Sequence, residues 1–230
     1  MILALLLACG RAPAPPPAAP APTREPCAES TPLRRLLWGD LHVHTALSFD
    51  AWIYDVRLTP DDAYAFARGE EVWLPPLGAD GRGTTATQLD RPLDFAAVTD
   101  HSEYLAEVQA CSTPGSPAYD DPVCVDYRAA TPASIQAWGT RFAVQEPERF
   151  DEICSSVDCL GDAADVWIQV QDAAEAAYDR TSACEFTSFV AYEWSSTTNV
   201  SNLHRNILDR SLANKRHKKE QFDILDADLI

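Results

Sequence analysis

Two histidines separated by a single residue are the first feature of this 230-residue sequence that can do chemistry. His42 and His44 follow the apolar run Leu36-Leu37-Trp38. Residues i and i+2 of a β-strand point to the same face, so both imidazoles would project together from a strand end and could clamp a metal ion. The same pattern also fits two histidines that are simply hydrogen-bonded in a polar pocket.

Two later segments favour the metal interpretation. The apolar stretch 94–98 ends in Thr99-Asp100-His101, and the aromatic, β-branched stretch 186–192 leads into Glu193 and then into His204. In proteins that alternate strands and helices, ligands gather at the carboxyl ends of the strands. Three apolar strands that each end on imidazole or carboxylate therefore predict a metal centre.

These motifs together resemble the polymerase and histidinol phosphatase (PHP) superfamily, and within it a branch of bacterial secreted proteins of uncharacterised function. The segments that carry the resemblance are Gly-Asp-Leu-His-Val-His-Thr at 39–45, Val-Thr-Asp-His at 98–101 and Tyr-Glu-Trp at 192–194 with the following His-Arg-Asn at 204–206. The resemblance covers residue 36 to the end. It implies a distorted β/α barrel that binds up to three divalent ions, usually as a phosphoesterase. The late Asp-x-His motif of the family is missing.

The resemblance also implies a ligand set. A first ion would be held by His42, His44 and Glu193, a second by Glu193 and His204, and a third by Asp50 and His101. Independently of the family, imidazole and carboxylate suit zinc, manganese or iron(II), and a bridging carboxylate brings two ions to about 3.5–4 Å. Such ions would activate water and neutralise the charge that builds on a phosphoryl or similar oxyanion.

The candidate catalytic residues are Glu193, His101, Asp100 and Arg205. Asp100, like Asp40, stands next to a ligand, and we expect it to orient a histidine rather than to bind metal. Arg205 and Asn206 could bind substrate oxygens. The alternatives are that Arg205 forms a surface ion pair and that Asn206 is an amide at a strand edge.

The amino terminus predicts export. Residues 1–9 form an apolar run too short to cross a bilayer, and Leu6-Leu7-Ala8-Cys9 resembles a lipoprotein processing site that would place a lipid on Cys9. A truncated ordinary signal peptide is the alternative. Residues 10–32 are rich in proline and alanine and predict an extended tether, which leaves 33–230 as the metal-dependent domain. We therefore expect a lipid-anchored protein of the cell envelope.

The six cysteines that remain after Cys9 are an even number, which suggests disulfides in an oxidising compartment. Short loops favour Cys111–Cys124 and Cys154–Cys159, which leaves Cys27–Cys184 as the third pair. A zinc cluster is the competing interpretation, but the spacing is irregular and lacks Cys-x-x-Cys.

Charge and element order bound the rest. The 35 acidic and 18 basic residues give a net charge of -17, which opposes non-specific binding to nucleic acid. Capping residues and apolar spacing predict helices over 59–69, 102–110, 131–145 and 162–178, and a hairpin over 72–89. Strands alternating with helices indicate an α/β fold. A complete β/α barrel typically needs about 250 residues, so the prediction is an incomplete barrel in the front part of a longer protein.

The sequence thus predicts a metal-dependent hydrolase that acts on a small-molecule phosphate or a related ester. A lipid-anchored protein that binds metal or ligand without turnover is the alternative.

Overall fold

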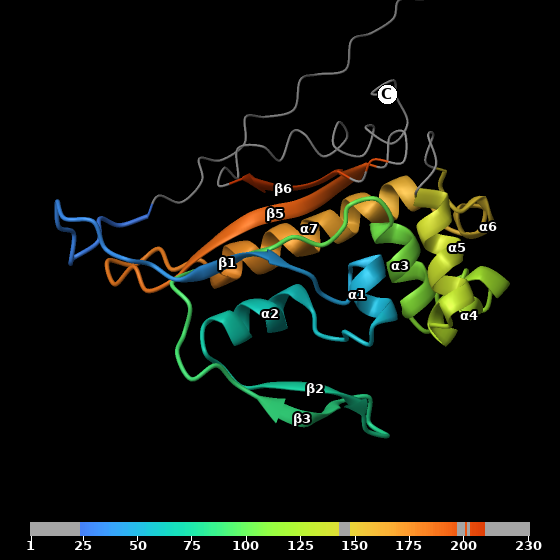
Figure 1. Ribbon diagram of the computed structural model, residues 1–230, viewed down its shortest axis with the longest axis horizontal. Helices are drawn as coiled ribbons and strands as arrows, with labels where there is room; N and C mark the ends of the chain where they lie inside the picture. Colours follow the sequence, from blue (N-terminus) through green and yellow to red (C-terminus); the bar gives the residue numbers. More distant parts are fainter. Residues whose placement is uncertain (1–23, 143–147, 197–200, 202, 210–230) are drawn as a thin grey trace, which may run out of the picture.

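A four-stranded sheet forms the centre of the computed structural model, which describes residues 24–142, 148–196, 201 and 203–209. Its strands are β1 (Gly39–Val43), β4 (Phe95–Val98), β5 (Thr187–Ser196) and β6 (Leu203–Asp209), in the order β1-β4-β5-β6. The first three strands are parallel, and β6 is antiparallel to β5. Strands β1, β4 and β5 are the three that the apolar runs predict, and the α/β class is confirmed (Figure 1).

The sheet is curled, so that its two edge strands approach each other. The side-chain amide of Asn206 on β6 donates to the carbonyl oxygen of Leu41 on β1 at 2.8 Å, although two strands separate β6 from β1 in the sheet order. In a flat sheet these edges would lie about 14 Å apart. The sheet is therefore a half-barrel with a concave inner face.

Glycine is needed where β1 begins. Gly39 pairs with Phe95 of β4, and a Cβ atom at Gly39 would lie 2.3 Å from the Phe95 carbonyl oxygen. Only a residue without a side chain fits at this distance, which fixes the register that places the following histidines.

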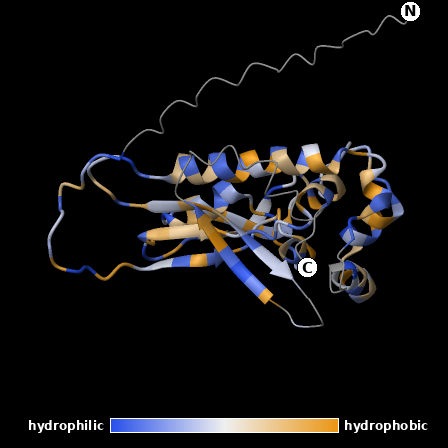
Figure 2. Ribbon diagram, turned by 90° about the horizontal axis from the view of Figure 1, so that it is seen from above, coloured by the Kyte–Doolittle hydropathy of each residue, from blue (hydrophilic) through white to orange (hydrophobic). Residues whose placement is uncertain are grey.

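Two helices cover the convex face of the sheet. They are α2 (Pro60–Ala67) and α7 (Cys159–Ala177), which pack against each other, with α2 on β4 and α7 on β5. Thr59 caps α2 in a reciprocal box with Asp62, as the sequence predicts. From above, α7 runs along the strands and carries hydrophobic residues at intervals (Figure 2). The core between these layers consists mainly of small residues with two aromatic rings, Tyr64, Ala67, Ala96, Val98, Ala173, Ala174, Ala177 and Phe186.

A second core lies within a cluster of short helices beside the carboxyl ends of the strands (Figure 1). These helices are α1 (Phe49–Ile53), α3 (Leu105–Ser112), α4 (Pro122–Ala129), α5 (Pro132–Phe142) and α6 (Asp151–Cys154). Tyr127 stacks on Trp138 at 4.1 Å between ring centroids, and Trp138 lies 4.3 Å from the ring of Phe150. The aromatic stack joins α4, α5 and the start of α6.

All three predicted disulfides are confirmed: Cys27–Cys184, Cys111–Cys124 and Cys154–Cys159. The first joins residues 157 positions apart in the sequence. Residues 24–28, which the composition assigns to the tether, are also hydrogen-bonded to the segment before β5, through Glu25 to Arg180 and Ala28 to Ser182.

A separate hairpin follows α2 along the chain. Strands β2 (Val72–Leu77) and β3 (Gly83–Thr87) pair antiparallel, as predicted, and lie beside α2 on the side away from β5 (Figure 1). The predicted signal over 1–9, Cys9, the first part of the tether and the basic cluster at 215–219 lie outside the described residues. Among the described residues, no helix is both long and apolar enough to cross a membrane.

Candidate metal centre

Glu193 is the central carboxylate of the site. Its side chain is 1% exposed, and each of its oxygens faces imidazoles. Glu193 Oε2 lies 2.8 Å from His42 Nε2 and 2.9 Å from His44 Nε2. Glu193 Oε1 contacts His204 Nδ1 and lies 3.8 Å from His101 Nε2. One buried carboxylate therefore gathers four histidines, of which His42 and His204 lie in β1 and β6, and His44 and His101 lie just after β1 and β4.

Strand geometry explains this convergence. His42 and His44 alternate with Val43, whose side chain packs toward the convex core, so both histidines point into the concave face. In the β5–β6 register Ser195 lies opposite His204, which puts His204 on the same face as Glu193. A single bridge between His101 and Glu193 extends the pairing of β4 with β5 beyond the end of β4.

Asp50 provides a second carboxylate from the start of α1. Its oxygens lie 3.1 Å from His44 Nδ1 and 3.6 Å from His101 Nε2. The hydroxyl of Ser48 donates to Asp50 at 2.6 Å and accepts from the backbone N–H of His101 at 3.1 Å. The turn after β1 thus fixes Asp50 against both histidines.

All six predicted ligands fall into three overlapping groups, and within each group the ligand atoms lie within 4.8 Å of one another. The groups are His42, His44 and Glu193; His44, Asp50 and His101; and His101, Glu193 and His204. The first reproduces the predicted set, whereas the other two each contain one histidine more than predicted. A further group, Glu107 with Cys154 and Cys159, is not a metal site because its cysteines form a disulfide.

The protonation of the metal-free site follows from its crowded carboxylates. Burial disfavours the imidazolium, but hydrogen bonds to Asp50 and Glu103 raise the pKa of His101 to about 10. Burial also opposes ionisation of Glu193, yet the hydrogen bond from His204 and the charge of His101 lower its pKa to about 2. Burial acts the same way on Asp50, and hydrogen bonds from His101 and His44 hold its pKa well below the usual range. In the metal-free site, carboxylates therefore surround the protonated ring of His101, and a divalent cation suits those carboxylates.

Solvent reaches one side of the site. The side chains of His42 and His204 are 59% and 42% exposed, whereas that of His101 is 4% exposed. The site opens between β1 and β6 and closes toward α1 and α3.

A comparison with protein-family models gives one match over most of the chain. The model is described as a protein of unknown function (DUF3604), and it matches residues 31–228. The chain belongs to the DUF3604 family. No curated protein and no solved structure matches it.

The two aspartates next to candidate ligands accept hydrogen bonds from the backbone. The sequence predicts instead that they orient histidine rings. Asp100 accepts from the backbone N–H of Thr45 and, at 2.7 Å, from its hydroxyl. Asp40 accepts from the backbone N–H of His42 at 2.9 Å. Burial raises the pKa of Asp100 to about 6. Asp100 therefore fixes the turn that carries His44.

Arg205, a predicted substrate-binding residue, lies on the convex face of the sheet, opposite the candidate metal centre. It pairs with Trp194, and both alternate with residues that point into the concave face. The side chain of Arg205 therefore points away from Glu193 and His204. Asn206 does share their face, but its amide is hydrogen-bonded to Leu41, in keeping with the alternative of a strand-edge amide.

Sequence reasoning missed Glu103 and Ser195. Glu103 is 3% exposed and lies 3.3 Å from His101 Nδ1, and the hydroxyl of Ser195 donates to Glu193 at 3.0 Å. Each stands two residues after a predicted ligand. In strand β5 that spacing places Ser195 on the face of Glu193 and could have found it, whereas Glu103 lies in the turn before α3, where strand spacing gives no signal.

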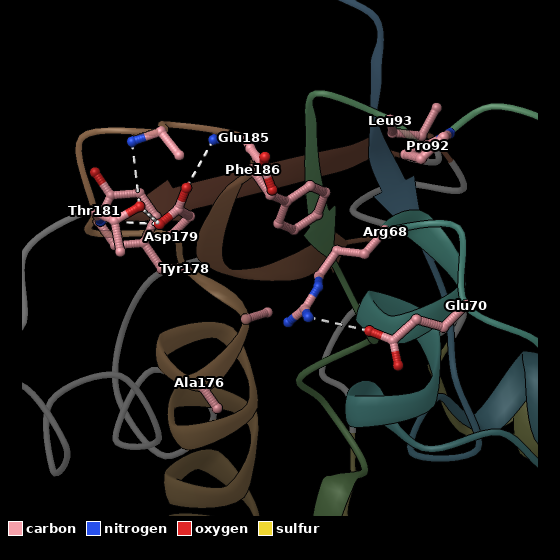
Figure 3. A pocket seen from close by; sticks show the side chains of 12 residues that line it. Arg68, Glu70, Pro92, Leu93, Ala176, Tyr178, Asp179, Thr181, Glu185 and Phe186 are labelled. Atoms are coloured by element: carbon pink, nitrogen blue, oxygen red, sulfur yellow. Dashed lines mark hydrogen bonds and ion pairs between the residues drawn. The ribbon is translucent and has the colours of Figure 1, made fainter. Parts of the chain in front are cut away.

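A pocket of about 810 Å³ lies at the opposite end of the sheet (Figure 3). Its lining includes Arg68 after α2, Leu93 before β4, Ala177 at the end of α7 and Phe186 before β5. None of the predicted ligands lines it, so the pocket and the metal centre are separate.

Proposed function

We propose that this DUF3604 protein is a metal-dependent hydrolase, a phosphoesterase of the PHP type, that acts on a small phosphate or related ester. The observation that carries the proposal is the position of Glu193, which turns one oxygen to His42 and His44 and the other to His101 and His204. Ionisable groups with strongly shifted pKa values, such as Glu193 and His101, cluster at functional sites. Imidazole with carboxylate fits zinc, manganese or iron(II).

The ligand geometry supports two ions with three protein ligands each. Glu193 Oε2 with His42 and His44 forms one set, and Glu193 Oε1 with His101 and His204 forms the other. A nitrogen lone pair serves one ion, so His101 Nε2 joins either Glu193 or Asp50. A third ion at Asp50 would therefore draw His101 away from the second set and leave that set with two protein ligands.

When bound, such ions supply Lewis-acid activation of water and stabilise charge on a phosphoryl oxygen. The residues of the chain hold and space the ions and shape the approach of the substrate. Glu193 spaces the two sets, and the exposed His42 and His204 border the side where an ester can approach. His101 and Asp50 form the closed wall. Open positions at each set are expected of catalytic rather than structural metals.

The half-barrel sheet supports the PHP assignment, because parallel strands whose carboxyl ends carry the ligands are the arrangement expected of a β/α barrel. The missing late Asp-x-His motif is the departure from that family, and the ligand sets above need no residue from it.

We further propose that the protein is exported and anchored to the cell envelope by a lipid on Cys9. The three disulfides support this, since disulfides persist mainly in oxidising compartments. Incorporation of labelled palmitate into the wild-type chain, and its loss in Cys9→Ser, tests the anchor.

The decisive experiment is metal analysis of protein purified without chelators, followed by hydrolysis assays. Chromogenic phosphomonoesters and phosphodiesters are offered with added manganese or zinc. We expect about two ions per chain and turnover that chelation abolishes. Metal at that stoichiometry without turnover of any ester would favour the alternative, a lipid-anchored binding protein. Protein that holds no metal would contradict both.

A further inference from the structure

Glu103 is a buried carboxylate beside the site that the mechanism above does not use. It lies between β4 and α3, it is 3% exposed, and its Oε1 accepts from the backbone N–H of Ser195 at 2.6 Å. Its Oε2 is buried, has no other hydrogen-bond partner among the described residues, and lies 3.3 Å from His101 Nδ1. Buried carboxylate oxygens need a donor, and here the imidazole is the group placed to supply one.

The other neighbour of His101 Nδ1 is also an acceptor. The Ser195 hydroxyl has one proton, and it has two partners closer than His101, namely Glu193 Oε1 at 3.0 Å, to which it donates, and His204 Nδ1 at 2.9 Å. Toward His101 Nδ1, at 3.3 Å, the same oxygen can therefore only accept. Two acceptors on one side of the ring require a proton on Nδ1.

We propose that Glu103 is a positioning residue of the metal centre, which holds a proton on His101 Nδ1 and so leaves Nε2 as the ligand atom. The inference rests on the proposed metal function. His101 Nε2 faces Asp50 at 3.6 Å and Glu193 at 3.8 Å, where an ion of the second set would lie. Outer carboxylates that fix the tautomer of a ligand histidine generally matter to metal affinity.

Two substitutions at Glu103 separate positioning from packing. In Glu103→Gln the amide oxygen stays on the Ser195 N–H, which turns the amide NH₂ toward His101 Nδ1. That nitrogen must then accept, so the neutral ring keeps its single proton on Nε2, the ligand atom. In Glu103→Ala the Ser195 N–H loses its partner and a void forms, but the Ser195 hydroxyl still accepts from Nδ1.

We therefore expect opposite orders for stability and for metal affinity. Glu103→Ala should be the less stable variant, while Glu103→Gln should bind zinc more weakly, by about 10–100-fold relative to wild type. If Glu103 served packing alone, Glu103→Ala would be both the less stable variant and the weaker zinc binder. Glu107→Gln is the matched control, because Glu107 is a fully buried carboxylate on α3 that pairs with Arg149 at 3.0 Å and contacts no proposed ligand.

The test uses the full chain, with zinc alone as the probe, titrated in competition with a chromogenic chelator. Spectra of metal-free protein labelled with ¹⁵N-histidine, recorded above the pKa of about 10 at which His101 becomes neutral, report which ring nitrogen keeps the proton. We expect the proton on Nδ1 in wild type and Glu103→Ala, and its loss from Nδ1 in Glu103→Gln. A retained Nδ1 proton in Glu103→Gln, or unchanged zinc affinity, would overturn the proposal. Absence of zinc binding by wild type, with the expected spectra, would overturn the metal function and leave the orientation of His101 by Glu103 standing.

Discussion

Replacing Glu193 with glutamine removes one ligand oxygen and keeps the side-chain size. The two oxygens of Glu193 face two different sets of histidines, and the amide nitrogen of glutamine cannot serve as a metal ligand. The glutamine side chain therefore offers an oxygen ligand to only one of the two ions. We therefore expect Glu193→Gln to hold at most one ion per chain where wild type holds about two.

The affinity for the remaining ion should fall as well. Loss of a partner behind a ligand costs about 10–100-fold in metal affinity, so loss of a charged ligand should cost more than about 100-fold. The fold should survive, because Glu193 lies on the concave face and the core between β5 and α7 does not include it.

The assay strips each protein with chelator, dialyses it against zinc and counts metal per chain, with circular dichroism as a check on folding. Asp50→Asn is the comparison variant. Asp50 belongs to neither of the two ligand sets built on Glu193, so this variant should still hold about two ions per chain. Glu107→Gln again controls for loss of a buried carboxylate. A folded Glu193→Gln protein that retains two ions would refute the bridging assignment, and loss of an ion in Asp50→Asn would show that a third set is filled.

Three further outcomes are expected. Replacing Cys27 and Cys184 by serine should lower the free energy of unfolding by about 5 kcal/mol, and the same change at Cys154–Cys159 by about 2 kcal/mol, because the closed loops span 157 and 5 residues; urea titrations measure both, and equal losses would count against the loop-entropy argument. In metal-free protein the pKa of His101 is raised to about 10, so its stabilising charge is fully present below about pH 6.5 and is lost as the pH rises toward 10; stability measured across that range should fall, and should fall less in His101→Gln. Arg205→Ala should leave metal content and ester hydrolysis unchanged, because its side chain points away from the site, and a large loss in either would mean that the register argument is wrong.

The sequence predicted the parts of the fold that have local signals. Apolar runs located β1, β4 and β5, and the Thr59 cap located α2. Strand β6 was missed because Leu203–Asp209 shows no apolar alternation, and its extended form depends on pairing with β5. The short helices α1 and α6 have too few residues for a periodic signal.

The six candidate ligands lie close together in the fold, as the sequence predicted, because each follows a strand or stands in a recognisable motif. Their neighbours were not. Arg205 was assigned to the site from its place beside His204, but adjacent residues of a strand point to opposite faces. Asp100 was assigned to a histidine and instead holds Thr45, a choice that depends on the path of the turn after β1.

The closure of the curled sheet has a consequence for how the protein folds. Glu193 meets His44 across 149 residues of sequence, and Asn206 meets Leu41 across 165. Contacts between such distant segments form slowly, because the entropy of closing a long loop is lost before the contacts compensate for it. The first and last strands must both be in place before the two oxygens of Glu193 have their histidines. A chain that is still folding therefore presents only the His42 and His44 pair, and capture of ions at both sets should be among the last events of folding.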